Sequence, residues 1–173
     1  CIEMGSRRTQ ELAAVAAARA AYIAGFNATS NLEAGRRYGV PTTGTAAHSF
    51  TLLFDSDRDA FTAQLAALGE GTTLLADTYD ATAAVRLGVE LTEGKLGAIR
   101  IDSGDLAEAT RLVRRQLDDL GATKTKIIVT SDLDEWNIAA LAGAPVDGYG
   151  VGTALATGSG HPTCGFVYKL VAR

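Results

Sequence analysis

The stretch LGAIRIDSGD, residues 96–105, shows most clearly which fold this sequence adopts. A short apolar run leads directly into two aspartates and a glycine, a pattern typical of a buried parallel strand that ends in a loop before a helix. The apolar runs at 73–76 and 126–130 have the same form, and each is followed by acidic residues. The repeated order of strand, acidic loop and helix predicts consecutive βα units of an α/β fold.

Helical segments separate these apolar runs. Residues 11–24 are rich in alanine and other helix-favouring residues, and Gly25 provides a stop. Further helices are expected at 31–38, 57–68, 79–87, 106–120 and 135–141. Additional strands are expected at 148–151 and 165–171.

The number of strands limits the architecture. Only about five are visible, whereas a closed barrel of eight βα units typically needs ~250 residues. We therefore expect residues 1–173 to be a single-domain fragment of an α/β barrel that does not close alone, and the start at Cys1 rather than methionine points the same way. A doubly wound open sheet remains an alternative, because periodicity does not separate the two folds.

Composition excludes several function classes. Twenty acidic residues against 16 basic ones give a formal charge of -4, and no run of lysine or arginine exceeds two, which argues against nucleic acid as a partner. No stretch approaches ~18 uninterrupted apolar residues, so no membrane span is expected. Two cysteines without metal-type spacing and no visible signal peptide favour a cytoplasmic protein.

Aspartates follow the three apolar runs in pairs. The later member of each pair is placed to cap the next helix; these are Asp80, Asp105 and Asp134. The earlier members lie at the strand tips, where α/β folds bind ligands; these are Asp77, Asp102 and Asp132. Carboxylates at this edge could hold ribose hydroxyls or a hydrated Mg²⁺ ion on a polyphosphate.

Three arginines also point to an anion site. Arg100 and Asp102 face the same side of an extended strand, so Arg100 either pairs internally with an aspartate or reaches an anionic ligand over the strand ends. Arg7 and Arg8 precede a helix, where cations meet the positive end of the helix dipole unless an anion is near. The alternative is that both are solvated arginines that lie over apolar surface.

A glycine-rich stretch, YGVGT at 149–153, overlaps the end of the expected strand at 148–151. Glycines at a strand end allow backbone N–H groups to approach a phosphate, and Thr153 adds a hydroxyl donor. Any tight turn between a strand and a helix can be glycine-rich, so this stretch alone is weak evidence.

Seven motifs together carry a family resemblance. They are EMGSRR at 3–8, GFNATSN at 25–31, GTAAHS at 44–49, DTYD at 77–80, IRIDSGD at 99–105, SDLD at 131–134 and YGVGT at 149–153. In this order they resemble the nicotinate phosphoribosyltransferases over almost the whole chain. The GTAAHS element distinguishes this family from quinolinate phosphoribosyltransferases of similar fold.

The resemblance implies an irregular α/β barrel of the type II phosphoribosyltransferases that works as a homodimer. Such enzymes join nicotinate to 5-phosphoribosyl 1-diphosphate in NAD salvage, giving nicotinate mononucleotide and diphosphate, with coupled hydrolysis of ATP and a requirement for Mg²⁺. The family histidine at the position of His48 is phosphorylated by ATP. A second hypothesis is that the chain is a non-catalytic structural or interaction fragment of such a barrel.

The resemblance also implies residue roles. His48, Asp102 and Arg100 match catalytic positions. The matching substrate-binding positions are Arg7, Arg8, Ser30, Asp77, Ser131, Asp132, Gly152 and Thr153. Ser30 stands where related nicotinamide enzymes carry an aspartate, which favours the acid over the amide as substrate. Met4 replaces a common phenylalanine, so a softer apolar contact must take the place of ring stacking.

Overall fold

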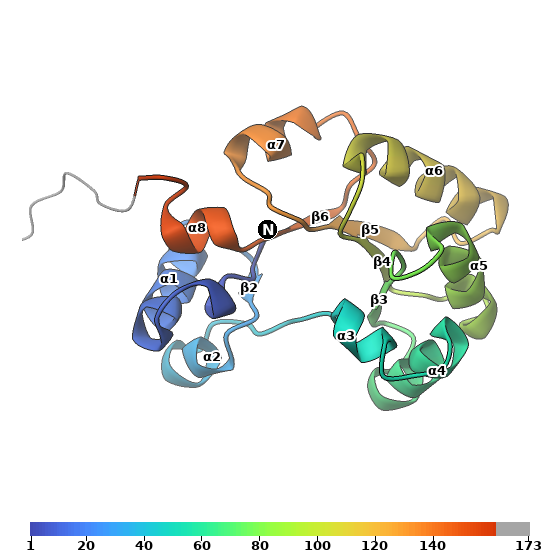
Figure 1. Ribbon diagram of the computed structural model, residues 1–173, viewed down its shortest axis with the longest axis horizontal. Coiled ribbons are helices and arrows are strands. Elements are labelled where there is room, and N and C mark those ends of the chain that lie inside the picture. Colours follow the sequence, from blue (N-terminus) through green and yellow to red (C-terminus); the bar gives the residue numbers. More distant parts are fainter. Residues whose placement is uncertain (162–173) are drawn as a thin grey trace, which may run out of the picture.

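Six parallel strands form one sheet in the computed structural model, which describes residues 1–161. The strands are β1 (Ile2–Glu3), β2 (Ala28–Thr29), β3 (Thr73–Leu75), β4 (Ala98–Ile101), β5 (Lys126–Val129) and β6 (Gly148–Val151). Their order in the sheet is β2-β1-β6-β5-β4-β3. Figure 1 shows them as an arc that stays open between β2 and β3.

The arc confirms the expected partial barrel. The helices are the 3₁₀ turn η1 (Ser6–Arg8), α1 (Glu11–Ile23), α2 (Leu32–Tyr38), α3 (His48–Thr51), α4 (Asp57–Leu68), α5 (Ala81–Leu91), α6 (Leu106–Asp119), α7 (Glu135–Ala140) and α8 (Thr153–Thr157). In Figure 1, α1, α5, α6 and α7 line the outer side of the arc. A doubly wound sheet would carry helices on both faces, so the curled half-barrel is the correct alternative.

The six main helices and the four strands predicted within residues 1–161 are all present. The structure adds β1 and β2 to the four strands predicted within residues 1–161, which gives a sheet of six. Each of the two added strands is two residues long, too short to give a period-two pattern. The predicted strand at 165–171 lies outside the described residues.

Helix α5 differs most from its prediction of 79–87. It begins at Ala81 and continues to Leu91, through Gly88. A Cβ atom at Gly88 would lie 3.1 Å from both Leu74 Cδ1 and Leu96 Cδ2. This glycine therefore allows close packing of the helix on the sheet, and it does not end the helix.

Aspartates cap three of the outer helices as predicted. Asp80 Oδ1 accepts a hydrogen bond from Ala83 N at 2.9 Å, at the start of α5. Asp105 and Asp134 do the same at the first turns of α6 and α7, with distances of 3.0 and 2.8 Å. Since these carboxylates cap helices, the earlier aspartates Asp77, Asp102 and Asp132 are the candidates for ligand binding at the strand tips.

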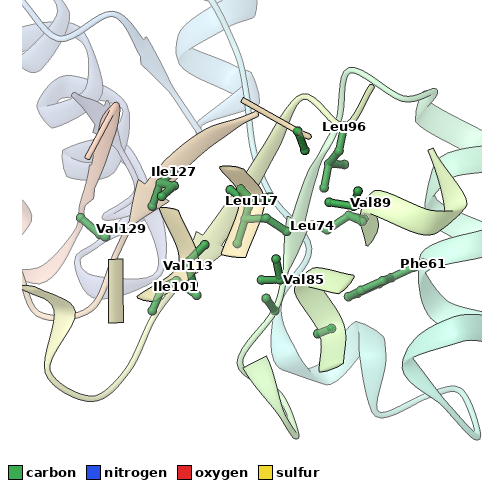
Figure 2. Packing of buried hydrophobic residues seen from close by; sticks show 14 of the residues in the cluster. Phe61, Leu74, Val85, Val89, Leu96, Ile101, Val113, Leu117, Ile127 and Val129 are labelled. Atoms are coloured by element: carbon green, nitrogen blue, oxygen red, sulfur yellow. The ribbon is translucent and has the colours of Figure 1, made fainter. Parts of the chain in front are cut away.

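The main hydrophobic core lies between the sheet and its outer helices (Figure 2). Leu74, Ile99 and Ile127 come from three neighbouring strands and are fully buried. Val85 of α5 and Leu117 of α6 pack against them. Full burial of one such side chain contributes roughly 1.5–3 kcal/mol, so this face fixes the strand order and register. Among residues 1–161, no helix is long and apolar enough to cross a membrane.

Candidate functional site

The candidate site lies at the carboxyl ends of the parallel strands, where α/β folds place their ligands. Two cavities adjoin there and share Met4, Arg7, Arg100 and Asp102 in their walls. The smaller cavity has a volume of about 210 Å³ and the larger about 510 Å³. Both are lined by loops that directly follow strands or precede helices.

Ten of the eleven residues predicted for the site line these cavities. The smaller cavity is lined by Arg7, Arg8, Arg100, Asp102, Ser131, Asp132, Gly152 and Thr153 among others. The larger one adds Ser30 and His48. Segments that are far apart in the sequence thus meet around one hollow, because parallel strands bring their carboxyl ends to the same edge.

Arg100 and Asp102 form the polar centre of the site. Arg100 Nη2 lies 2.9 Å from Asp102 Oδ1. The Thr130 hydroxyl donates a hydrogen bond to the same carboxylate oxygen and accepts one from Arg100 Nε at 2.7 Å. Of the two interpretations of Arg100, the internal pair is therefore present, but the side chain still lines both cavities and can meet a ligand there.

The loop that carries His48 is anchored by the same arginine. Arg100 Nη1 donates to Thr45 Oγ1 at 2.6 Å and to the Ala46 carbonyl at 3.1 Å. This loop spans the chain between α2 and the four-residue helix α3, which His48 begins. Guanidinium groups hold several acceptors in fixed directions, so Arg100 sets the distance between the β4 tip and the loop.

His48 contacts two residues at the strand tips. Its Nε2 lies 3.4 Å from Asp102 Oδ2, and its Nδ1 lies 3.1 Å from Thr78 Oγ1. The side chain is 38% exposed and lines the larger cavity. The imidazole is thus held in one orientation while remaining reachable by a ligand.

Asp102 is kept ionised by its neighbours. Partial burial of the carboxyl opposes ionisation, but hydrogen bonds from Thr130 and Arg100, with the charges of Arg100 and His48, outweigh it and hold the pKa of Asp102 below its usual range. A negative charge is therefore fixed beside cationic Arg100 at the junction of the two cavities.

Asp77 is the one predicted site residue that does not line either cavity. Its Oδ2 accepts hydrogen bonds from Asp102 N at 2.8 Å and from Ser103 Oγ at 2.6 Å. Asp77 therefore joins the loop after β3 to the loop after β4 without lining either cavity. Its Oδ1 is buried and has no partner within residues 1–161. In this structure Asp77 supports Asp102 and makes no direct contact with the hollow.

Glycines at the end of β6 allow neighbouring groups to pack closely in the wall of the smaller cavity. A Cβ atom at Gly150 would lie 2.6 Å from Thr130 Cγ2 and 2.8 Å from Met4 Sδ, and one at Gly152 would lie 3.1 Å from Met4 O. Thr153 Oγ1 donates to Asp132 Oδ1 at 3.3 Å across the cavity wall. A Cβ atom at Gly150 would therefore displace the side chain of Thr130 or Met4, and one at Gly152 would press on the Met4 backbone.

Ser131, in the wall of the smaller cavity, has an unusual backbone conformation. Its φ of 110° is in the region that L residues rarely adopt. Residues held in such conformations cost of order 1–3 kcal/mol and are found most often at ligand sites. With this conformation the chain turns after β5, and Ser131 lines the smaller cavity.

Arg7 and Arg8 are both exposed on η1, and neither forms an ion pair with another residue of 1–161. Cationic side chains left without a partner beside a hollow favour an anionic ligand. Within the same residues, no group of three or more His, Cys, Asp or Glu side chains is arranged to hold a metal ion.

Three threonines at the site were missed by the sequence analysis. Thr130 bridges Arg100 and Asp102, Thr45 anchors the loop to Arg100, and Thr78 orients His48. Thr78 lies inside the DTYD motif and Thr45 inside GTAAHS, so the motifs contained the signal. Thr130 ends an apolar run and gives no sign of its role without the neighbouring strand.

Known proteins resemble this chain closely. No protein-family model matches it. It is 64% identical to a nicotinate phosphoribosyltransferase of Mycobacterium tuberculosis over 98% of the chain, and 43% identical to the nicotinate phosphoribosyltransferase of Bacillus subtilis over 99% of it. The chain spans about two fifths of the length of these relatives, 40% and 36% respectively.

Solved structures agree with this likeness. Human nicotinic acid phosphoribosyltransferase superimposes with a TM-score of 0.75 at 27% identity, over 87% of this chain and 42% of that chain. The nicotinate-nucleotide pyrophosphorylase of Pyrococcus furiosus gives a TM-score of 0.83 at 27% identity, over 90% of this chain and 42% of that chain. Seven ordered motifs, the half-barrel and the 64% identity agree, and the chain belongs to the nicotinate phosphoribosyltransferase family.

Proposed function

We propose that the protein containing this chain is a nicotinate phosphoribosyltransferase, which forms nicotinate mononucleotide and diphosphate from nicotinate and 5-phosphoribosyl 1-diphosphate in the cytoplasm. The observation that carries the proposal is the convergence of Arg7, Arg100, Asp102 and Gly152 on one hollow at the strand ends. A sugar bearing both a phosphate and a diphosphate needs cations, a hydroxyl acceptor and close backbone N–H groups within one site.

Each group has a place in the proposed reaction. The amides and hydroxyls around Gly152, Thr153 and Ser131 would hold the ribose and its 5-phosphate. Arg7 and Arg8 would bind the diphosphate and the nicotinate carboxylate. Ser30 would lie beside that carboxylate without repelling it, whereas an aspartate there would exclude the acid.

Bond making needs little acid or base catalysis. The nicotinate ring nitrogen attacks C1 of the ribose, and the bond from C1 to the diphosphate oxygen breaks with its electron pair passing to the diphosphate. Positive charge develops on the ribosyl ring in the transition state, and the ionised Asp102 at the cavity junction stabilises it. Arg100, which pairs with Asp102 and lines both cavities, would neutralise the departing diphosphate.

Mg²⁺ would act on the diphosphate. The ionised Asp102 at the junction of the cavities would be the carboxylate nearest to a hydrated ion on the diphosphate, with Asp77 behind it. When bound, the ion would supply charge neutralisation to the leaving group.

ATP would be used through His48. An imidazole nitrogen attacks the γ-phosphorus of ATP, the bond to the β,γ-bridging oxygen breaks, and ADP leaves. Phosphohistidine is reactive enough to be hydrolysed later in the cycle. Thr78 would hold the ring at Nδ1 through this step, which leaves Nε2 as the attacking nitrogen.

The proposal includes a homodimer, which the resemblance to the family implies; the edge strands β2 and β3 need cover either from the rest of the longer protein or from a second subunit. The activity is tested by supplying the full-length protein with phosphoribosyl diphosphate and, separately, nicotinate, nicotinamide or quinolinate. We expect nicotinate mononucleotide and diphosphate in equal amounts, with a faster rate when ATP is present. Product from nicotinamide or quinolinate alone, or none from any of the three, would contradict the proposal.

A further inference from the structure

Glu3 at the end of β1 has the only buried carboxylate side chain within residues 1–161 and is 1% exposed. No arginine, lysine or histidine of that range lies within ion-pair distance of it. A buried carboxylate is costly unless hydrogen bonds satisfy it. None of the reaction steps above uses this residue, so its position needs a separate explanation.

Hydrogen bonds around Glu3 form a closed ring. One carboxylate oxygen accepts from Gly5 N and the other from the Thr29 hydroxyl. Thr29 Oγ1 in turn accepts from Asn31 N at 2.9 Å, and Asn31 Nδ2 donates to Ser6 Oγ at 3.1 Å. Ser6 follows Gly5 in the chain, which closes the ring.

The ring holds two walls of the candidate site together. Gly5 O accepts from Arg8 N at 2.8 Å, which closes the turn η1 that carries Arg7 and Arg8. The backbone carbonyl of Glu3 accepts from Ser30 N at 2.8 Å. One residue therefore fixes the arginine turn with its side chain and the Ser30 loop with its backbone.

Space on the far side of the turn is also restricted. A Cβ atom at Gly5 would lie 2.9 Å from Gly152 O and 3.0 Å from the Glu3 carboxylate. The turn is thus held between Glu3 and the β6 end. Because no ion pair within residues 1–161 holds the Arg7 side chain, its place in the cavities depends on this backbone.

We propose that Glu3 is a positioning residue whose ring of hydrogen bonds with Thr29, Asn31 and Ser6 fixes the Arg7 turn and so sets the affinity of the site for anions. The identity of the anion, phosphoribosyl diphosphate, rests on the proposed function. The ring acts on binding more than on bond breaking, since Arg100 and Asp102 belong to β4 and the loop after it, outside the ring.

The test uses Glu3→Gln and Thr29→Val in the full-length protein. Glutamine cannot accept a hydrogen bond at both ends of its amide, and valine has no hydroxyl to link Glu3 to Asn31. We expect the Kd of inorganic diphosphate, measured by calorimetry, and the KM for phosphoribosyl diphosphate each to rise about tenfold, with a smaller change in kcat.

Thr110→Val is the matched control. Thr110 is also fully buried, but its hydroxyl bonds only to carbonyls of its own helix, at Leu106 and Ala107. Its Kd and KM should stay at wild-type values. Ser6→Ala opens the ring from its partly exposed side, so it retains the test if either buried variant fails to fold, and it should raise Kd in the same direction.

The outcomes separate this inference from the proposed function. Wild-type Kd and KM in all three ring variants, or equal losses in Thr110→Val, would overturn the role of Glu3 while leaving the enzyme activity intact. A wild-type protein that makes no nicotinate mononucleotide, yet binds diphosphate more tightly than the ring variants do, would refute the proposed function and support the ring. Absence of diphosphate binding by the wild type would overturn both.

Discussion

His48 Nε2 lies 3.4 Å from Asp102 Oδ2, so a histidine from a loop after α2 meets a carboxylate from the tip of β4. The two residues are 54 positions apart, and Arg100 holds both of their segments. The proposed ATP-using group and the proposed ribose-stabilising group therefore share one anchor. This arrangement lets a change at His48 alter the site in which the sugar reacts.

His48→Ala should abolish stimulation by ATP and leave slow ATP-independent synthesis, because the sugar chemistry needs no imidazole. The measurement is the rate of nicotinate mononucleotide formation with and without ATP, together with label transfer from γ-labelled ATP to the protein. His161→Ala changes the only other histidine, which is exposed, and should behave as wild type. Labelling of the His48→Ala protein would show that another residue receives the phosphate.

Asp102→Asn should lower kcat by about 10²-fold while changing nicotinate affinity much less, since the charge acts mainly on the transition state. Steady-state kinetics and equilibrium binding of nicotinate to the full-length protein give the two quantities. Comparable losses in kcat and in affinity would argue that Asp102 serves ground-state binding instead.

Thr130→Val should destabilise the protein by about 2 kcal/mol, because it removes hydrogen bonds to two charged groups, Arg100 and Asp102. The free energy of unfolding is measured by denaturant titration. Thr92→Val is the control: Thr92 is equally buried, but its hydroxyl bonds only to helix carbonyls at Gly88 and Val89, so the loss should be smaller. Equal losses in both variants would disprove the bridging role of Thr130.

Asp102 should also make the free energy of unfolding depend on pH in the acidic range. Its pKa is lowered in the folded state, so the unfolded state binds more protons in the interval between the folded and unfolded values. Its stabilising contribution is present above the unfolded pKa of about 3.9 and is lost as pH falls through the folded value. The difference in unfolding free energy between wild type and Asp102→Asn should therefore shrink on acidification below about pH 4.

Asp57 should show the opposite pH dependence of the free energy of unfolding in the same experiment. Burial raises the pKa of Asp57, and its Oδ1 has no partner within residues 1–161. Its ionised form therefore lowers the free energy of unfolding at neutral pH. Compared with wild type, Asp57→Asn should be more stable at pH 7 and should lose this advantage at pH 3. If Asp57→Asn followed the direction predicted for Asp102→Asn, the burial account of Asp57 would be wrong; if Asp102→Asn followed the direction predicted for Asp57→Asn, the electrostatic account of Asp102 would be wrong.

Ser131 separates backbone strain from side-chain chemistry. Ser131→Gly should raise the free energy of unfolding by about 1 kcal/mol, since glycine adopts a φ of 110° without the steric cost. Ser131→Ala keeps the strain and removes the same hydroxyl. Both variants should bind phosphoribosyl diphosphate more weakly than wild type, and a stability gain in the alanine variant would contradict the strain argument.

Local pattern was sufficient to predict most of the fold. The runs at 96–101 and 126–130, the alanine-rich helix and the three capping aspartates all depend on contacts within a few residues, and the structure confirms them. β1 and β2 could not be found this way. Each is held by parallel pairing with strands distant in the sequence, such as Ile2 with Gly150.

The candidate site was predictable in its members but not in its connections. Alternation along β4 placed Arg100 and Asp102 on one side, and their pairing at 2.9 Å follows from that geometry. The position of Asp77 behind Asp102, the Thr130 bridge and the Glu3 ring arise from neighbouring strands, and no spacing in the sequence encodes them.

The most direct test of the account is a crystal structure of the full-length protein with nicotinate mononucleotide and diphosphate. We predict the 5-phosphate against Gly152 and Thr153, the diphosphate beside Arg7 and Arg100, and the ribose next to Asp102. Ligand density at any other place, with the hollow shared by these residues left to solvent, would contradict the proposed site.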